Sequence, residues 1–147
     1  MSAEGWISYN YAVVRVVPRV HLGTFVNVGV LVHARTAGFL GIRILTDPAD
    51  LAPLVPSTDV ELLSRYLRSL RGICEGSAEF GAVALVPPSE RFHWLTALRS
   101  DIIQSSPVHG GLCDDPERVL EELYAEFVEG RAGATRLFGY RLDREDG

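Results

Sequence analysis

The sequence contains no lysine, so all 14 of its basic side chains are arginine. This absence excludes a phosphate-binding loop of the Walker type, which needs a lysine to reach the phosphates. No Gly-x-Gly-x-x-Gly pattern occurs either, which removes the usual dinucleotide fingerprint. Two interpretations of the arginine bias stay open. The codons of the genome favour arginine, or some of these side chains recognise carboxylates or phosphates in bidentate fashion.

Cysteine is also scarce, and long apolar runs are missing. Cys74 and Cys113 each follow or precede apolar residues, which predicts buried free thiols, with a disulfide or redox pair as the alternative. No apolar stretch approaches the roughly 20 residues that span a bilayer. Residues 1–6 lack a basic patch followed by an apolar stretch, so we expect no signal peptide and a cytoplasmic location.

The composition is that of an ordinary folded domain. The chain has 147 residues, of which 47% are hydrophobic and 22% charged, and we expect one domain over 1–147 with a frayed tail at 143–147. The net charge of −5 argues against non-specific binding of nucleic acid, which needs a basic footprint.

Three strands are predicted in the first third of the chain. Residues 6–17 are rich in aromatic and β-branched side chains, residues 25–34 alternate strictly, and residues 39–45 form a third apolar run. Residues 18–24 are expected to form a loop, and short connections predict an antiparallel meander. His33 ends the second strand and is expected at the surface. Gly29 marks either a bulge or an aromatic neighbour that lies over it, or else the close approach of a ligand to the backbone.

Two helices are predicted further along. Thr58 with Glu61 resembles a capping box, and Gly76 terminates the apolar periodicity that follows. A second helix covers 116–129, where Asp115 is expected as the N-cap before a proline at the first helical position.

The order of these elements predicts the fold class. Strands that precede helices predict an α+β domain, with an antiparallel sheet that starts with the meander and is flanked by at least two helices on one face. Residues 81–86 form a short apolar element that the sequence does not assign to helix or strand. Residues 135–142 are expected to add one more strand.

Residues 89–113 show neither a helical nor a strand period, and a segment that breaks the pattern is where function or strain is expected. Guanidinium groups can clamp a phosphate, hydroxyls and amides can add donors, and histidine can act as general acid or base. The candidates are Arg91 and Arg99 as clamp, Ser100, Gln104 and Ser106 as donors, His93 and His109 as catalytic groups, and Arg15 and Asn27 from the strands.

Other readings of this chemistry compete. The arginines could pair with carboxylates while the hydroxyls cap turns. No Gly-x-Ser-x-Gly elbow supports a nucleophilic serine, and no Cys-x-x-Cys supports a metal site. Phe92 and Trp94 are expected to anchor the core. We therefore expect no metal and no cofactor.

Several separated motifs, in order over about residues 7–128, resemble the bacterial domain of unknown function 3037 family. They are Tyr11-x-x-x-Arg15-x-x-Pro18, Gly23-x-Phe25-x-Asn27-Val28-Gly29-Val30, Arg91-Phe92-His93-Trp94-Leu95, Arg99-Ser100, and Gln104-x-Ser106-Pro107-x-His109-x-Gly111-Leu112. One departure is Leu98, where the family tends to carry proline before the arginine.

The resemblance implies no established reaction. It implies genes that neighbour HipA-like kinases, and hence an accessory or antitoxin-like partner of such a kinase. We expect a non-enzymatic, regulatory module that binds another protein and no membrane, and a homo-oligomer stays open. The alternative is an enzyme or ligand-binding domain that acts on a phosphorylated or nucleic-acid-derived substrate through the Arg/His/Ser residues above.

Overall fold

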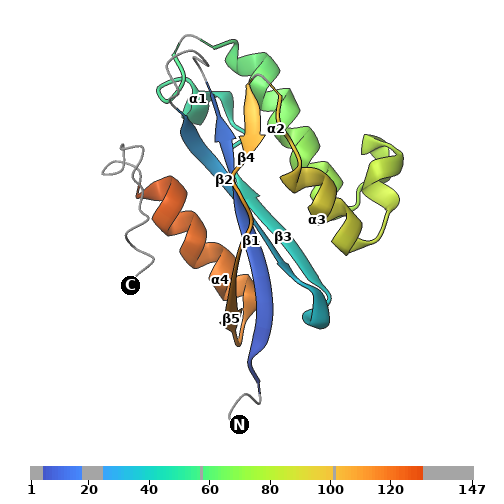
Figure 1. The fold of residues 1–147 in the computed structure, drawn as a ribbon. Coiled ribbons are helices and arrows are strands. Elements are labelled where there is room, and N and C mark those ends of the chain that lie inside the picture. Colours follow the sequence, from blue (N-terminus) through green and yellow to red (C-terminus); the bar gives the residue numbers. More distant parts are fainter. Residues whose placement is uncertain (1–4, 18–24, 57, 101, 131–147) are drawn as a thin grey trace.

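The computed structural model describes residues 5–17, 25–56, 58–100 and 102–130 (Figure 1). Its strands form an antiparallel sheet, as the sequence predicts, and the first three make the expected meander. They are β1 (Ile7–Val16), β2 (Val26–Ala34), β3 (Phe39–Ile44), β4 (Ile103–Ser105) and β5 (His109–Cys113).

The first strand is central, because every other strand except β3 pairs with it. The order is β3-β2-β1, and the far edge of β1 is shared by two short strands. β4 pairs with its second half, where Val14 lies opposite Ser105, and β5 pairs with its first half, where Tyr11 lies opposite His109. The sequence between β4 and β5 therefore bridges a break along one edge of the sheet.

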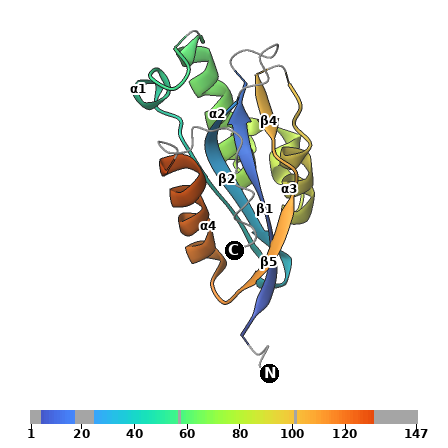
Figure 2. The same ribbon diagram turned by 60° about the vertical axis from the view of Figure 1, so that its left-hand side comes forward.

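Helices cover both faces of this sheet (Figure 2). They are α1 (Pro48–Leu51), α2 (Val60–Glu75), α3 (Pro88–Thr96) and α4 (Pro116–Tyr124), which continues as a π-helical turn over Ala125–Glu129. Short 3-10 turns lie at Arg35–Ala37, Ala78–Phe80 and Ala82–Leu85, so the apolar segment 81–86 is a 3-10 element.

The alternation of β2 explains why both faces are covered. Leu31 packs in the core with residues of α2 and α3, whereas Val30 and Val32 pack with residues of α4. The prediction of at least two helices on one face is confirmed by α2 and α3. The second helix that the sequence predicts, α4, lies on the opposite face.

The first long helix begins one residue later than its predicted cap. Asp59, not Thr58, is the N-cap, and its carboxylate accepts a hydrogen bond from the Leu62 amide at 3.2 Å. Thr58 still belongs to the preceding turn, because its amide donates to the Val55 carbonyl at 3.0 Å. The predicted end is confirmed, since Gly76 adopts a left-handed conformation with φ of 77°.

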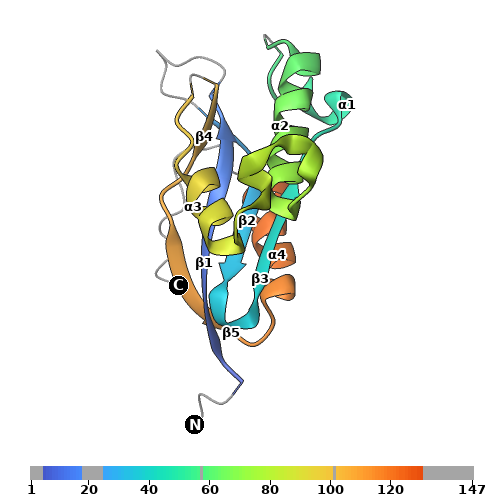
Figure 3. The same cartoon turned by 90° about the vertical axis from the view of Figure 1, so that its right-hand side faces the viewer.

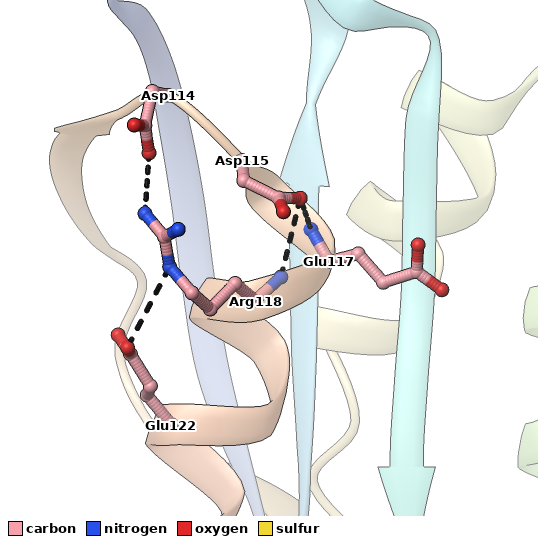
Figure 4. Close-up of polar contacts among 5 residues, drawn as sticks. All are labelled: Asp114, Asp115, Glu117, Arg118 and Glu122. Carbon is pink, nitrogen blue, oxygen red and sulfur yellow. Dashed lines mark hydrogen bonds and ion pairs between the residues drawn. The ribbon is translucent and has the colours of Figure 1, made fainter.

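The start of α4 is confirmed as predicted (Figure 4). The Asp115 carboxylate accepts hydrogen bonds from the amides of Glu117 at 3.1 Å and Arg118 at 3.3 Å, which satisfies two donors that the first helical turn leaves unpaired. The Arg118 guanidinium bridges Asp114 at 2.5 Å and Glu122 at 3.7 Å. All of these groups are exposed, so the pairs add little stability beyond the cap.

The expectation that 89–113 is irregular is wrong. This segment contains most of α3 and all of β4 and β5. The helix escapes pattern analysis because only Phe92 and Leu95 are buried on it. The strands escape because β4 is only three residues long and β5 includes a Gly-Gly pair.

His33 is buried, contrary to prediction, with 7% of its surface exposed. Its ring lies 5.1 Å from the ring of Phe92, and its Nε2 is 3.3 Å from the Ser89 hydroxyl, so α3 covers it. Burial, with a contribution from Arg35, lowers the pKa of His33.

Three predictions fall outside the described residues: the loop at 18–24, the strand at 135–142 and the frayed tail at 143–147. None of the helices that the structure describes is long and apolar enough to cross a membrane.

Candidate functional site

The predicted site residues lie in three places rather than in one pocket. One group lines the face of the sheet that α4 covers. A second group lies on α3, against the opposite face. The third group closes the turns that lead into and out of β4.

The first group is a row across three strands. Arg15 of β1 lies opposite Asn27 of β2 on one side and Gln104 of β4 on the other. The Arg15 guanidinium carbon lies 4.2 Å from the centre of the Phe25 ring, a cation–π contact. The Asn27 amide donates to the Phe127 carbonyl at 3.1 Å and so ties β2 to the π-helical turn after α4. Arg15, Asn27 and Gln104 therefore lie in one row across the sheet.

His109 lies further along this same face. It pairs with Tyr11 across β5 and β1, and the two ring centres are 5.4 Å apart. Tyr11 also stacks on Phe127, with 6.0 Å between ring centres. The imidazole is exposed, so it caps an aromatic cluster at the surface instead of entering a cleft.

Arg91 holds the two helices of the opposite face together. Its Nε donates to the Cys74 carbonyl at 3.3 Å and its terminal nitrogen donates to the Val86 carbonyl at 2.6 Å. These bonds connect α3 with the end of α2 and with the connection that follows it. Burial raises the pKa of the Cys74 thiol to about 12, against the opposing charge of Arg91, so the thiol stays protonated near neutral pH.

Arg99 and Ser100 form the turn between α3 and β4. The Ser100 hydroxyl accepts from the Ile103 amide at 2.9 Å and donates to the Ile103 carbonyl at 2.9 Å. The Arg99 guanidinium donates to the carbonyls of Leu98 at 2.6 Å and Ser105 at 3.3 Å. Both side chains therefore satisfy backbone groups that the turn would otherwise leave to water.

Ser106 is buried at the break between β4 and β5. Its hydroxyl accepts from the Val13 amide at 2.8 Å, and its own amide donates to the Val13 carbonyl at 2.8 Å. The side chain thus supplies the ladder hydrogen bond that the broken edge cannot make. This geometry matches the interpretation in which hydroxyls of the segment serve turns.

His93 and Trp94 are exposed on α3. Together with Ser89 and Glu90 they line a shallow pocket of about 470 Å³. Trp94 is 42% exposed, so the expectation that it anchors the core is wrong, while Phe92, which is 7% exposed, confirms it. The residues that line this pocket with His93 include no arginine.

Glycine 29 follows a bulge in the pairing of β1 with β2. A Cβ at this position would lie 2.8 Å from Cγ1 of Ile44 and 2.9 Å from the Arg43 carbonyl. Close packing by β3 therefore accounts for the glycine without a ligand. Both cysteines are buried and free, as predicted, and no group of three His, Cys, Asp or Glu within the described residues could hold a metal.

Two surfaces of the structure are not among the sites predicted from the sequence. The first lies on the α3 side of the sheet, below the helices, where the start of β1 and its partner β5 are not covered by a described helix (Figure 3). By strand alternation its members are Trp6, Ser8, Asn10, Gly110 and Leu112, which we call the open face. Neighbouring residues of a strand face opposite sides of a sheet, and Cys113 is buried with α4. Leu112 therefore faces the other side, which the sequence would predict if β5 were identified as a strand.

The second surface is the polar side of α2, where arginine recurs at Arg65, Arg68 and Arg71. A spacing of three residues places these side chains on one side of a helix. That spacing was readable in the sequence and could have revealed the cluster.

These features define an α+β domain with a split edge strand and no recognised catalytic constellation among the described residues. The chain matches the family described as "Protein of unknown function (DUF3037)" over residues 11–128, and it belongs to that family. No curated protein and no solved structure matches the chain.

Proposed function

We propose that the chain is a non-enzymatic module that regulates another protein by binding it through the open face and the adjoining edge of β5. The observation that carries this proposal is an apolar surface that no described element covers. Leu112 is 65% exposed and Trp6 is 54% exposed, although both lie beside a well-packed sheet. Exposed apolar side chains grouped on one surface are typical of sites for protein partners.

The sheet explains why these side chains lie together. Ser8 of β1 pairs with Leu112 of β5, and Asn10 pairs with Gly110. The Asn10 side chain lies over Gly110, where an added Cβ would be 3.2 Å from Oδ1 of Asn10. α3 packs against β2, β3 and β4, further along the sheet, and leaves this end accessible.

The edge of β5 adds backbone hydrogen-bonding groups to the apolar surface. Among the described strands β5 pairs only with β1, so its other edge is available to a further strand. Exposed edges in monomeric proteins usually carry charged residues or proline that prevent association. The residues of β5, 109–113, include no Arg, Asp, Glu or Pro. A partner strand could therefore pair with β5 while its side chains contact Leu112.

The partner that we propose to test first is a HipA-like kinase. The support is the resemblance-based expectation that genes of this family neighbour such kinases, which is an argument by association. Binding of the module to the kinase would then give it an accessory or antitoxin-like role.

The test is co-expression of the chain with the products of the genes that flank it, followed by affinity measurement on any complex. Leu112→Asp places a charge on the open face and is expected to weaken binding at least tenfold. Leu85→Asp is the matched control, because Leu85 is 64% exposed and lies in the 3-10 turn before α3. Neither substitution removes buried surface, so both variants should fold.

Two outcomes would overturn the proposal. No complex with any flanking product, or equal affinities for the Leu112→Asp and Leu85→Asp variants, would remove the open face as the binding site. A homodimer measured by light scattering and lost in Leu112→Asp would assign this surface to a second copy of the chain and contradict a heterologous partner.

The alternative, an enzyme with an Arg/His/Ser pocket, receives less support from the geometry. Arg91, Arg99 and Ser106 direct their hydrogen bonds to backbone groups. His93 lies on the face opposite His109, because α3 and the Tyr11–His109 pair belong to opposite sides of the sheet.

A further inference from the structure

A pocket of about 480 Å³ lies on the solvent side of α2, away from the open face. Arg65, Arg68 and Arg71 line it from α2, and Phe80 lines it from the 3-10 turn that follows the helix. Pockets of roughly 300–1,000 Å³ are the size at which proteins bind small molecules. The site contains none of the residues of the open face.

The three arginines of this pocket form no salt bridge with any described residue. Within the described part of the chain, salt bridges involve Arg43 and Arg118 only. Arg68 donates to the Ser64 hydroxyl at 2.5 Å, and Arg71 donates to the Thr46 hydroxyl at 3.4 Å. Both contacts are with neutral groups and leave the guanidinium charges free to act on a ligand.

Like charges on neighbouring helical turns repel one another. An anion that contacts Arg65, Arg68 and Arg71 would remove this repulsion. Guanidinium groups also present paired N–H donors that match the oxygens of phosphate. The α2 pocket is therefore suited to a phosphate in a way that a single surface arginine is not.

The ring of Phe80 provides the apolar side of the pocket. It packs directly on Gly72 of α2, where an added Cβ would lie 2.1 Å from two ring carbons. A glycine in the interior of a helix is less favourable than alanine. The close packing of the ring on the helix explains why glycine occupies this position. The same packing keeps an aromatic ring beside the three arginines.

Two carboxylates, Glu75 and Glu79, also line the pocket. They disfavour a pure polyanion, as does the net charge of −5. They suit a ligand that carries N–H donors near its phosphate, because carboxylates accept such hydrogen bonds. Phosphate, flat ring and N–H donors occur together in a nucleoside phosphate.

We propose that the α2 pocket binds a nucleoside phosphate, with the phosphate on Arg65, Arg68 and Arg71 and the base stacked on Phe80. Stacking of a base on an aromatic side chain adds to the affinity of a site for a nucleotide. The site would give the module a small-molecule effector that acts apart from its protein-binding surface.

The test is isothermal titration of the full chain with AMP and GMP, and separately with adenosine and inorganic phosphate. We expect saturable binding of at least one nucleotide, weakened at least tenfold by Arg65→Gln and by Arg68→Gln. Arg35→Gln is the matched control, because Arg35 is exposed in the 3-10 turn after β2 and should leave the affinity unchanged.

A second variant separates the two halves of the site. Phe80→Leu should weaken nucleotide binding and leave the affinity for inorganic phosphate unchanged. The proposal is overturned if neither nucleotide binds, if Arg65→Gln and Arg68→Gln bind as the unmodified chain does, or if inorganic phosphate binds as tightly as the nucleotides. These outcomes are independent of the partner-binding test, since a different surface is changed.

Discussion

Replacing Ser106 by alanine tests whether this predicted site residue serves the fold or a ligand. The hydroxyl is 2.8 Å from the Val13 amide, in a part of β1 where Val13 is 5% exposed. Removal of the oxygen leaves that amide buried without its acceptor. An unsatisfied buried donor costs about 1–3 kcal/mol, so we expect the free energy of unfolding to fall by that amount.

The measurement is urea unfolding of the Ser106→Ala variant beside Ser8→Ala. Ser8 is exposed on the same strand as Val13, so its variant should unfold within about 0.5 kcal/mol of the unmodified chain. For a chain of this length, each kcal/mol corresponds to a shift of about 2–4 °C in Tm, which a thermal scan can check.

One result would refute the reasoning. If Ser106→Ala retained full stability, the hydrogen bond to Val13 would not hold the broken edge together. A hydroxyl that could be removed without a cost in stability, yet was needed for binding of a phosphorylated ligand, would restore Ser106 to the Arg/His/Ser pocket.

Two further predictions concern packing and pH. Gly72→Ala should lower the free energy of unfolding by about 1–3 kcal/mol in the unmodified chain, because its Cβ meets the Phe80 ring. In a Phe80→Ala background the same substitution should raise the free energy of unfolding by about 0.5–1 kcal/mol, because the ring atoms nearest to the Cβ are gone and helix propensity favours alanine. Urea unfolding of the unmodified chain, the two single variants and the double variant would contradict this if the sign did not change. Burial lowers the pKa of His33 in the folded chain, so the unfolded chain binds the proton more readily. The contribution of His33 to the free energy of unfolding should therefore be complete above about pH 6.5 and should decrease as the pH falls from there toward the lowered pKa. A His33→Leu variant should lose this part of the pH dependence, and an unchanged slope between pH 7.5 and 5 would contradict it.

The parts of the fold that the sequence predicts are those with a single strong period. The sequence of the second strand alternates, and α4 has both an aspartate cap and a proline at its start, so the sequence predicts both elements. The predicted strict alternation is broken by a bulge, which places Val28 in the core with α2 and α3 and Val30 in the core with α4. The helix and the two strands within 89–113 are not predicted, because short elements carry too few residues to show a period. In α3 the buried side chains are Phe92 and Leu95, while aromatic Trp94 points outward.

The candidate site was harder to predict than the fold, because residue type does not reveal what a polar side chain faces. Arg91 and Arg99 are the residues that a phosphate site would use, yet both donate to carbonyls of the chain itself. The row from Asn27 through Arg15 to Gln104 depends on pairing between strands that are far apart in sequence. Such proximity requires the strand order, which periodicity alone cannot supply.

The account rests on the claim that the open face and the β5 edge form the binding surface for a protein partner. The most direct measurement is amide hydrogen exchange of the complex with a flanking gene product, compared with the free chain. The account predicts slower exchange at residues 109–113 and at 6–10, with no change in α4. Protection confined to α4, or unchanged exchange in β5, would contradict it.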